Sequence, residues 1–303
     1  MNSLEEALYL NPLELSGPEQ MAIDLFLLEK SFTEQSFNMA IRFYTWDGDW
    51  LSIGKNQKVL PKGWLKLLKN EQLKIVRRPS GGNAVLHSRG LTYALIWKYP
   101  PRNKKESYLK TTQWLKCGLK KAGVDLSFGT EPVHISNSNC FSTSTLADLI
   151  DKDKNKHIGS AQYWRKGHLL QHGEILMEPS KQLWKKVFNT DPPKIKNEIK
   201  DKGKVINILK ESFSKIWPGL EMSNYKLDKK DKDSTKFCAL AKKLVTDNAF
   251  EVSNSALQIL GGYGYLTEYK IEKIVRDLRV HQILEGTNEI MQLIIARHIL
   301  SET

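Results

Sequence analysis

Cysteine and long apolar runs are scarce in this sequence. Its 303 residues include three cysteines, Cys117, Cys140 and Cys238, which are too few and too scattered for a disulfide framework or a zinc site. This usage indicates a reducing compartment with at most one reactive thiol. No stretch approaches the ~18 uninterrupted apolar residues of a membrane helix, and the first ten residues are acidic, unlike a secretory signal. We therefore expect a cytoplasmic protein without a membrane segment or a metal.

Acidic residues are also in the minority. The sequence has 46 lysines and arginines against 34 aspartates and glutamates, a formal net charge of +12 at pH 7. Such a charge predicts attraction to nucleic acid, a membrane surface or an acidic carrier protein. The lysines are dispersed, and neither an arginine-rich helix nor a nucleic-acid motif is present, so we do not expect a nucleic-acid partner.

The first 225 residues mix the patterns of helices and strands. We expect helices at residues 19–32, 106–122, 181–188 and 204–217, and strands at residues 41–46, 51–54, 75–78, 91–95, 158–164 and 169–177. Short turns predict that 41–46 pairs with 51–54 as one hairpin, and 158–164 with 169–177 as another. The expected fold class is α+β, with a mixed β-sheet and flanking helices.

Beyond residue 225 the pattern changes. Residues 226–233 (KLDKKDKD) form a charge run and are the best linker candidate in the chain. Residues 234–303 show helical patterns, one glycine-rich turn and no convincing strand. We therefore expect a first domain at residues 1–225, a charged linker, and an all-α segment at 234–303.

A glycine turn with an arginine pair lies between two of the expected strands. Gly81 and Gly82 lack a Cβ, so a ligand can approach the main-chain N–H groups there. Arg77 and Arg78 offer planar donors, and His87 offers a titratable nitrogen. A plain glycine hairpin with a solvated basic rim fits the same pattern.

Two further residues are candidates for chemistry. Cys140 lies in a polar segment, residues 127–145, which we expect to be a long loop where a thiol is accessible, although an incidental loop thiol is the commoner case. Lys156 is either a solvated lysine or, beside a bound thioester, a cation that orients a carbonyl oxygen. His172 lies within a strand and is expected to be a hydrogen-bonded structural histidine.

Seven motifs follow one another over most of the first domain. They are MAID (Met21–Asp24), RFYTW (Arg42–Trp46), LSIGKNQ (Leu51–Gln57), RRPSGGNAVLH (Arg77–His87), LTYALI (Leu91–Ile96), KHIGSAQ (Lys156–Gln162) and QHGEIL (Gln171–Leu176). Together they resemble the biotin/lipoate A/B protein ligase family. The resemblance implies that family's catalytic fold and one of two chemistries. Lipoate ligases activate free lipoate with ATP, whereas octanoyltransferases of the LipM type take octanoate from acyl carrier protein through a cysteine thioester.

The segment NCF (Asn139–Phe141) resembles the nucleophile motif of the second group. The resemblance therefore implies Cys140 as the nucleophile and Lys156 as the active-site lysine. Asn83 stands where the family usually has glycine or arginine, and the proline often found after the cysteine motif is missing, but no reacting group is lost. The implied substrate-binding residues are Arg77, Arg78, Ser80, Gly81, Gly82, Asn83, Ala84, His87, Gly159, Ser160, Ala161, His172 and Gly173.

Thioester chemistry agrees with this resemblance. Exchange between a cysteine thiolate and a thioester is nearly balanced, so an acyl-enzyme forms without ATP, and attack by a lysine amine then gives an amide. The implied partners are octanoyl-acyl carrier protein and an acceptor such as a lipoyl domain or the glycine-cleavage H protein, and no cofactor is implied. The carrier and acceptor families are typically acidic, which would give the net positive charge a use.

The C-terminal segment resembles a different family. ALQILGGYGY (Ala256–Tyr265), VRDLRVHQILEGTNEI (Val275–Ile290) and IARHIL (Ile295–Leu300) are similar to the extreme C-terminus of acyl-CoA dehydrogenases. The resemblance implies that Glu285, Gly261 and Gly262 are remnants of a dehydrogenase site. Because the part of that fold that holds flavin is missing, we expect no dehydrogenase activity, and we expect the helices to expose apolar surface.

The leading hypothesis is thus an octanoyltransferase acting through Cys140. An ATP-dependent lipoate-protein ligase is the first alternative. The second is a non-catalytic scaffold or chimera with an inactive dehydrogenase tail, and a flavoprotein is the least favoured. The tail itself fits a gene fusion, an artificial join or an appendage for oligomerisation.

Overall fold

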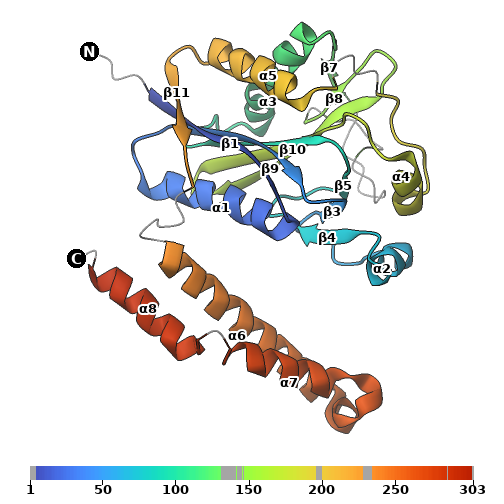
Figure 1. The fold of residues 1–303 in the computed structure, drawn as a ribbon, viewed down its shortest axis with the longest axis vertical. Helices are drawn as coiled ribbons and strands as arrows, with labels where there is room; N and C mark the ends of the chain where they lie inside the picture. Colours follow the sequence, from blue (N-terminus) through green and yellow to red (C-terminus); the bar gives the residue numbers. More distant parts are fainter. Residues whose placement is uncertain are drawn as a thin grey trace. The chain divides into compact units, whose positions relative to one another are not determined.

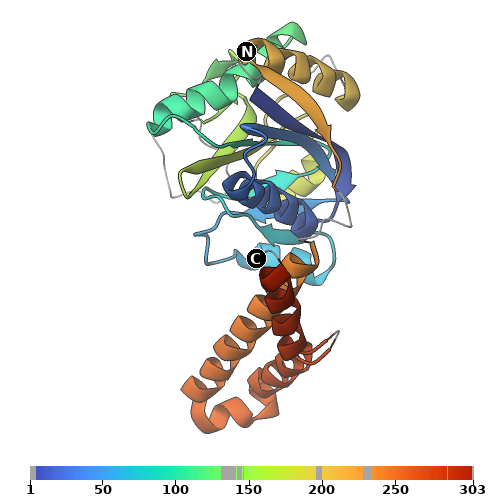
Figure 2. The same ribbon diagram turned by 90° about the vertical axis from the view of Figure 1, so that its left-hand side faces the viewer.

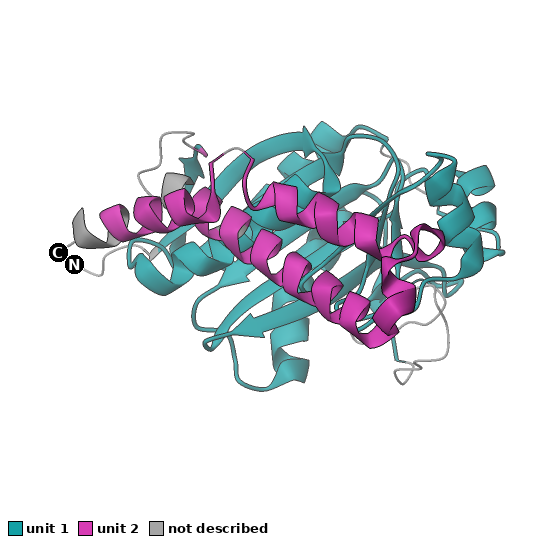
Figure 3. Cartoon of the chain, turned by 90° about the horizontal axis from the view of Figure 1, so that it is seen from below, with its two compact units in different colours: residues 1–226 teal, residues 227–303 magenta. Residues whose placement is uncertain are grey.

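A computed structural model describes residues 5–130, 141, 145, 147–195, 200–227, 234–284 and 286–301. The chain divides into two compact units, residues 1–226 and residues 227–303, which Figure 3 shows in different colours. Each unit is described by itself below.

Unit 1 is built on a mixed eight-stranded sheet (Figure 1). The strand β1, second from one edge, runs parallel to its neighbours β11 and β2, and the other neighbouring pairs in the sheet are antiparallel. In spatial order the strands are β11 (Leu220–Tyr225), β1 (Glu5–Leu15), β2 (Met39–Trp46), β6 (Leu91–Trp97), β10 (His168–Ile175), β9 (Lys156–Arg165), β8 (Leu149–Ile150) and β7 (Ser127–Phe128).

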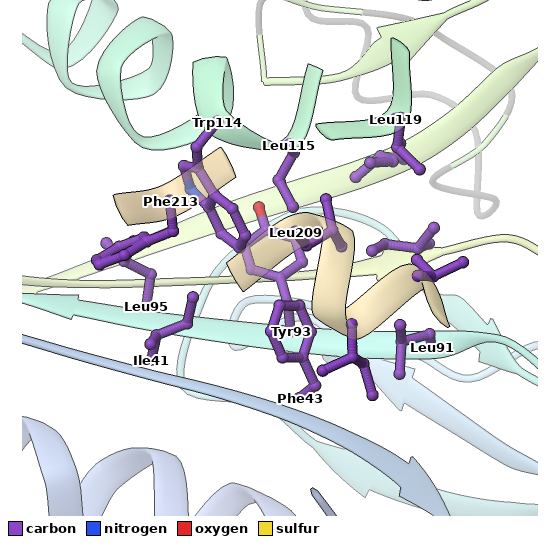
Figure 4. Packing of buried hydrophobic residues seen from close by; sticks show 14 of the residues in the cluster. Ile41, Phe43, Leu91, Tyr93, Leu95, Trp114, Leu115, Leu119, Leu209 and Phe213 are labelled. Carbon is purple, nitrogen blue, oxygen red and sulfur yellow. The ribbon is translucent and has the colours of Figure 1, made fainter. Parts of the chain in front are cut away.

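Alternation along the central strands gives this sheet one apolar and one polar face. Ile41 and Phe43 of β2 belong to the same buried cluster as Tyr93 and Leu95 of β6. Figure 4 shows side chains from α3 (Lys104–Lys121) and α5 (Lys202–Ile216) packed over these residues. Because successive side chains of a strand point to opposite faces, the intervening residues point the other way, toward α1 (Gly17–Thr33).

A second, three-stranded sheet holds the glycine turn of the sequence. Its strand order is β4 (Lys74–Arg77), β3 (Trp50–Ile53) and β5 (Val85–His87). Two short helices, α2 (Lys62–Lys69) and α4 (Lys181–Phe188), supply buried side chains to the core beneath it.

The expected hairpin of residues 41–46 and 51–54 is wrong. β2 lies between β1 and β6, so both of its edges already carry ladder hydrogen bonds and none is left for β3. β3 pairs instead with β4 and β5 in the second sheet. The segment before residue 91 was likewise expected to be a simple connection, whereas it contains β5.

Other expectations for unit 1 agree with the structure. The four predicted helices correspond to α1, α3, α4 and α5, and the hairpin of β9 and β10 has the predicted turn. The α+β class with a mixed sheet and flanking helices is confirmed. Residues 127–128, expected to begin the long loop at 127–145, form β7 instead, and most of the rest of that range lies outside the described residues. The strands β1, β7, β8 and β11 and the helix α2 were not predicted.

Unit 2 is helical, as expected. It contains α6 (Ser234–Leu260), α7 (Ile271–His281) and α8 (Asn288–Ser301), with short 3-10 turns at Gly261–Tyr265 and Thr267–Tyr269. α6 packs against both α7 and α8 (Figure 2). Lys242 of α6 donates to the carbonyl of Gly286 at 2.7 Å and to the side chain of Asn288 at 2.7 Å, which ties α6 to the start of α8.

Apolar side chains remain on the surface of unit 2. Val245, Val252 and Ile259 are 67%, 70% and 86% exposed, as expected for helices that lack their usual partners. Gly261 and Gly262 are exposed, and Glu285 lies outside the described residues. Within the described part of the chain, no helix is long and apolar enough to cross a membrane.

Candidate functional site

A cavity opens between the polar face of the large sheet and the second sheet. The open space there is about 360 Å³, a volume that includes solvent at its mouth. Most of the surface that faces it is apolar, although eight of the fourteen lining residues have polar or charged side chains. The lining residues are Met21, Tyr44, Trp46, Ser52, Arg78, Val85, His87, Thr92, Gly159, Ser160, Ala161, His172, Gly173 and Glu174.

One side of the cavity depends on a buried carboxylate, that of Asp24. Arg42 Nη1 lies 3.2 Å from Asp24 Oδ1, and the hydroxyl of Tyr44 donates to Oδ2 at 3.2 Å. His172 Nδ1 lies 2.9 Å from the same Oδ2, so the ring carries its proton there and Nε2 can accept from Ser80 Oγ at 2.6 Å. Burial, and then the Asp24 charge, raises the pKa of Tyr44 well above its usual range, so this hydroxyl remains a donor.

A second chain of hydrogen bonds crosses the same wall. His87 Nδ1 lies 2.7 Å from Glu174 Oε2, and His87 Nε2 lies 2.8 Å from Ser52 Oγ. The His87 ring stacks on Trp46, with ring centroids 4.1 Å apart, and Trp46 Nε1 donates to Thr92 Oγ1. Both imidazoles in the cavity wall are therefore oriented by a carboxylate on one side and a hydroxyl on the other.

The two hydrogen-bond networks, one at Asp24 and one at His87, involve cross-strand neighbours in two successive rows of the large sheet. Arg42, Ala94 and His172 face one another across β2, β6 and β10, and the next row along places Thr92 opposite both Tyr44 and Glu174. The pairing register of three strands thus brings residues that are distant in sequence into one wall.

The arginine pair binds main-chain carbonyl groups. Arg78 is buried and donates to the carbonyl oxygens of Ser52, Gly81 and Asn83 at 2.7–2.8 Å. Arg77 donates to the carbonyls of Gly54 and Gln57, both at 2.9 Å. The guanidinium groups, expected to face a ligand, hold two loops together, and Arg78 also lines the cavity.

Lys156 is buried at the start of β9. Its Nζ lies 2.9 Å from Asp148 Oδ1 and 5.2 Å from the ring centroid of Phe141. Asp148 Oδ2 in turn accepts from the main-chain N–H of Thr145 at 2.7 Å. A Cβ on Gly159 would lie 3.1 Å from Lys156 Cε, so the lysine stem passes over a glycine that lines the cavity.

Glycine at position 173 allows β9 and β10 to approach each other at the cavity. A Cβ there would lie 2.5 Å from the carbonyl oxygen of Gly159 and 2.8 Å from the Tyr93 ring. The Tyr93 hydroxyl lies 2.7 Å from Ser160 Oγ, and burial raises the pKa of Tyr93 above its usual range. The tyrosine therefore stays protonated beneath the cavity floor.

Seven of the thirteen predicted substrate-binding residues line this cavity, namely Arg78, His87, Gly159, Ser160, Ala161, His172 and Gly173. Ser80 lies behind them, bonded to His172. Arg77 and Gly82 are exposed, Gly81 and Asn83 are half-buried, and Ala84 is buried in the core of the second sheet. Lys156 is held by Asp148, and Cys140 lies outside the described residues.

Several residues of the site were missed from the sequence. Asp24 and Arg42 carried a signal, since a charge on the apolar face of a helix or within a buried strand needs a partner. Ser52 and Glu174 stand within the motifs LSIGKNQ and QHGEIL, but no pattern paired them with His87, because that pairing depends on contacts distant in sequence. Asp148 lies in none of the seven motifs. Within the described residues, no group of three or more His, Cys, Asp or Glu side chains is placed to hold a metal ion.

Each of the two units matches the model of a known protein family. The family model of the lipoyl protein ligase A/B catalytic domain matches residues 16–219, and that of the acyl-CoA dehydrogenase C-terminal domain matches residues 222–300. The chain belongs to the lipoyl protein ligase A/B catalytic domain family. The expected resemblances of both parts of the chain are thereby confirmed.

Individual relatives divide in the same way. Octanoyltransferase LipM of Carboxydothermus hydrogenoformans is 35% identical over 176 residues, which cover 56% of this chain and 64% of that protein. The chain thus spans just under two thirds of that relative's length. Mitochondrial isobutyryl-CoA dehydrogenase of Bos taurus is 49% identical over 76 residues, or 25% of this chain and 18% of that protein.

Solved structures of the family share the fold. The crystal structure of lipoate-protein ligase A bound with ATP superposes with a TM-score of 0.60, covering 76% of this chain and 92% of that one at 19% identity. At this identity the likeness establishes the architecture of unit 1 alone.

Removing the carboxylate of Asp148 tests the buried ion pair of this lipoyl ligase fold. Asp148→Asn removes a carboxylate that lies 2.9 Å from the buried Lys156 ammonium, and we expect the free energy of unfolding of unit 1 to fall by about 3 kcal/mol. Tryptophan fluorescence during urea unfolding measures this in unit 1, because all eight tryptophans lie within residues 46–217. Asp125→Asn, which removes an exposed partner of Lys120, is the control and should cost less than about 1 kcal/mol. Equal losses in the two variants would contradict the structural importance of the buried pair.

His157 makes the stability of unit 1 depend on pH. Burial lowers the pKa of His157, although Asp151 Oδ2, 3.1 Å from Nε2, partly opposes this. The unfolded chain therefore takes up a proton first, and stability falls as the pH drops below about 6.5 toward the folded-state pKa. We expect the Tm to decline between pH 7.5 and 5.5, and less steeply in His157→Gln. Part of the slope remains because burial and two lysines, Lys98 and Lys166, also lower the pKa of His168. Identical pH profiles for the two proteins would refute this assignment.

Proposed function

We propose that this protein is an octanoyltransferase of protein lipoylation, which moves an octanoyl group from acyl carrier protein to a lysine of a lipoyl-accepting protein. The observation that carries the proposal is the placement of Lys156, an ammonium held beside Asp148, over Gly159 of the cavity and against Phe141. Cys140 directly precedes Phe141 in the sequence. The similarity to LipM octanoyltransferases supports the same reaction.

In the proposed first step, the Cys140 thiolate attacks the thioester carbonyl carbon of the carrier-bound octanoyl group. A new C–S bond forms at Cys140, the bond to the carrier sulfur breaks, and the carrier leaves as its thiol after taking up a proton. The Lys156 ammonium would orient the carbonyl oxygen and stabilise the negative charge that develops on it. Asp148 Oδ1, 2.9 Å from Nζ, would keep this lysine in place.

In the proposed second step, a neutral lysine amine of the acceptor attacks the Cys140 thioester. An amide bond forms, the C–S bond breaks, and the proton released by the amine returns to the cysteine sulfur. Amide formation from a thioester lowers the free energy, so the reaction requires neither ATP nor a cofactor. A lipoyl domain or the glycine-cleavage H protein is the proposed acceptor.

The cavity suits the acyl chain. Met21, Val85, Ala161 and the Trp46 ring present apolar surface. Most polar groups of the wall bond one another, whereas Glu174 Oε1 is buried and accepts no hydrogen bond. Arg78, His87 and His172 would thus shape the pocket, while the bond-making residues lie on the segment at Cys140 and at Lys156.

The first alternative is an ATP-dependent lipoate-protein ligase. It is favoured by the match of residues 16–219 to the lipoyl protein ligase A/B catalytic domain family. That chemistry needs no cysteine, so lipoylation that requires ATP and tolerates the loss of Cys140 would select it. The second alternative, a non-catalytic scaffold or chimera, would show binding without turnover, with activity recovered by truncation after Tyr225.

Incubation with octanoyl-carrier protein followed by intact-mass measurement tests the proposal. We expect one octanoyl group on the wild-type protein, lost on treatment with neutral hydroxylamine, which cleaves thioesters. The Cys140→Ser variant should show no hydroxylamine-sensitive adduct, and the matched controls Cys117→Ser and Cys238→Ser should acylate like the wild type. A thioester adduct that persists without Cys140, or none on any of the proteins, would refute the mechanism.

A further inference from the structure

Two helices of unit 1 pack together beside the second sheet. Trp64 Nε1 of α2 donates to the carbonyl oxygen of Val187 of α4 at 2.7 Å, and Lys186 donates to Gln72 at 3.2 Å. The buried faces of the two helices contribute Trp64, Leu183, Trp184 and Val187 to the core. Their remaining faces are turned outward (Figure 1).

The outward faces carry a concentration of positive charge. Residues 55–74 and 181–194 contain ten lysines, against the two acidic residues Glu71 and Asp191. Leu65, which is 50% exposed, lies among these lysines on α2. We call this region the α2–α4 lysine surface, which comprises Lys62, Leu65, Lys66, Lys69, Lys181, Lys185 and Lys186, all exposed.

Aromatic contacts connect this surface to the proposed reaction centre. The Phe141 ring, beside Lys156, lies 5.6 Å from the Trp184 ring of α4, and Trp184 lies 5.1 Å from Phe188. The ring centroids of Phe188 and Trp64 of α2 are in turn 6.3 Å apart. The helix α4, which carries three of the lysines, therefore packs directly against the Phe141 ring.

The other end of the charged region contacts β9, the strand whose residues Gly159, Ser160 and Ala161 line the cavity. Arg77 holds the loop at residues 54–57 through its carbonyls, and Lys55 of that loop lies over the Tyr163 ring of β9, 5.5 Å from its centroid. Gly54 packs so closely on the glycine turn that a Cβ would lie 1.9 Å from the Gly82 carbonyl oxygen. Lys55 is thus held beside β9 by the contacts of its loop with Arg77 and the glycine turn.

We propose that the α2–α4 lysine surface docks the acidic protein that delivers the acyl thioester. This inference rests on the proposed function. Dispersed exposed lysines around one exposed leucine suit an acidic protein surface with a small apolar centre, which would steer encounter and leave the thioester arm free to enter the cavity. The contact between α4 and Phe141 would bring a docked carrier close to the Phe141 and Lys156 side chains.

Charge reversal with two kinds of donor tests the docking surface. The variant Lys62→Glu/Lys66→Glu alters the surface. Lys104→Glu/Lys105→Glu, two exposed positions on α3 against the other face of the large sheet, is the control with an equal change in net charge. The donors are octanoyl-carrier protein and the uncharged octanoyl-N-acetylcysteamine thioester. The measured quantity is the rate of acyl-enzyme formation, by intact mass.

With the carrier donor, we expect the Lys62→Glu/Lys66→Glu rate to fall about tenfold at low salt, and the difference to shrink as ionic strength rises. With the uncharged donor its rate should match the wild type, and the control variant should be unchanged with both. No loss with the carrier, or equal losses with both donors, would overturn the proposal. A loss confined to transfer from the acylated enzyme to the acceptor would also overturn it, by assigning the surface to the acceptor. Failure of the proposed function is distinct, since the wild type would then acylate with neither donor.

Discussion

The buried carboxylate of Asp24 is the constraint on which the arrangement of unit 1 depends. An ionised group out of contact with water costs several kcal/mol unless it is paired and hydrogen-bonded, so α1 can dock only where Arg42, Tyr44 and His172 meet it. His172 in turn hydrogen-bonds through Nε2 to Ser80 in the glycine turn, so the position of that turn also depends on Asp24. One side chain thereby links a helix, two strands and the loop that borders the cavity.

A second buried ion pair sets the opposite end of the site. Lys156 and Asp148 join β9 to the turn at residues 145–148, and the Phe141 ring covers the ammonium. Between these two pairs, His87 and Glu174 bond each other. Asp24 and Lys156 thus each meet an opposite charge within the protein, whereas Arg78 binds carbonyl oxygens and Glu174 Oε1 accepts no hydrogen bond. In the proposed reaction, the Lys156 ammonium over Gly159 would suit a polarised carbonyl, and the apolar surface of Met21 and Val85 would suit the acyl chain.

Sequence patterns within short segments predicted those elements whose structure depends on contacts between residues close in sequence. The β9–β10 hairpin and four helices could be placed because their periodicity and turns lie within short segments. β1 and β11 were missed because they pair in parallel across more than 200 residues, and Pro12 lies at the register shift of β1, which obscures its strand pattern. The arginine pair was recognised as important, but its binding to the carbonyls of Ser52 and Gly54 depends on the second sheet, which the sequence pattern did not show. For Cys140 the expectation rests on the motif alone.

The requirement for an energy source distinguishes octanoyl transfer from ligation most directly. The measurement is modification of an apo lipoyl domain, followed by mass, with octanoyl-carrier protein without ATP in one reaction and free lipoate with ATP in the other. The account predicts octanoylation in the first reaction, its loss in Cys140→Ser, and no modification in the second. Modification that depends on ATP and persists in Cys140→Ser would contradict it.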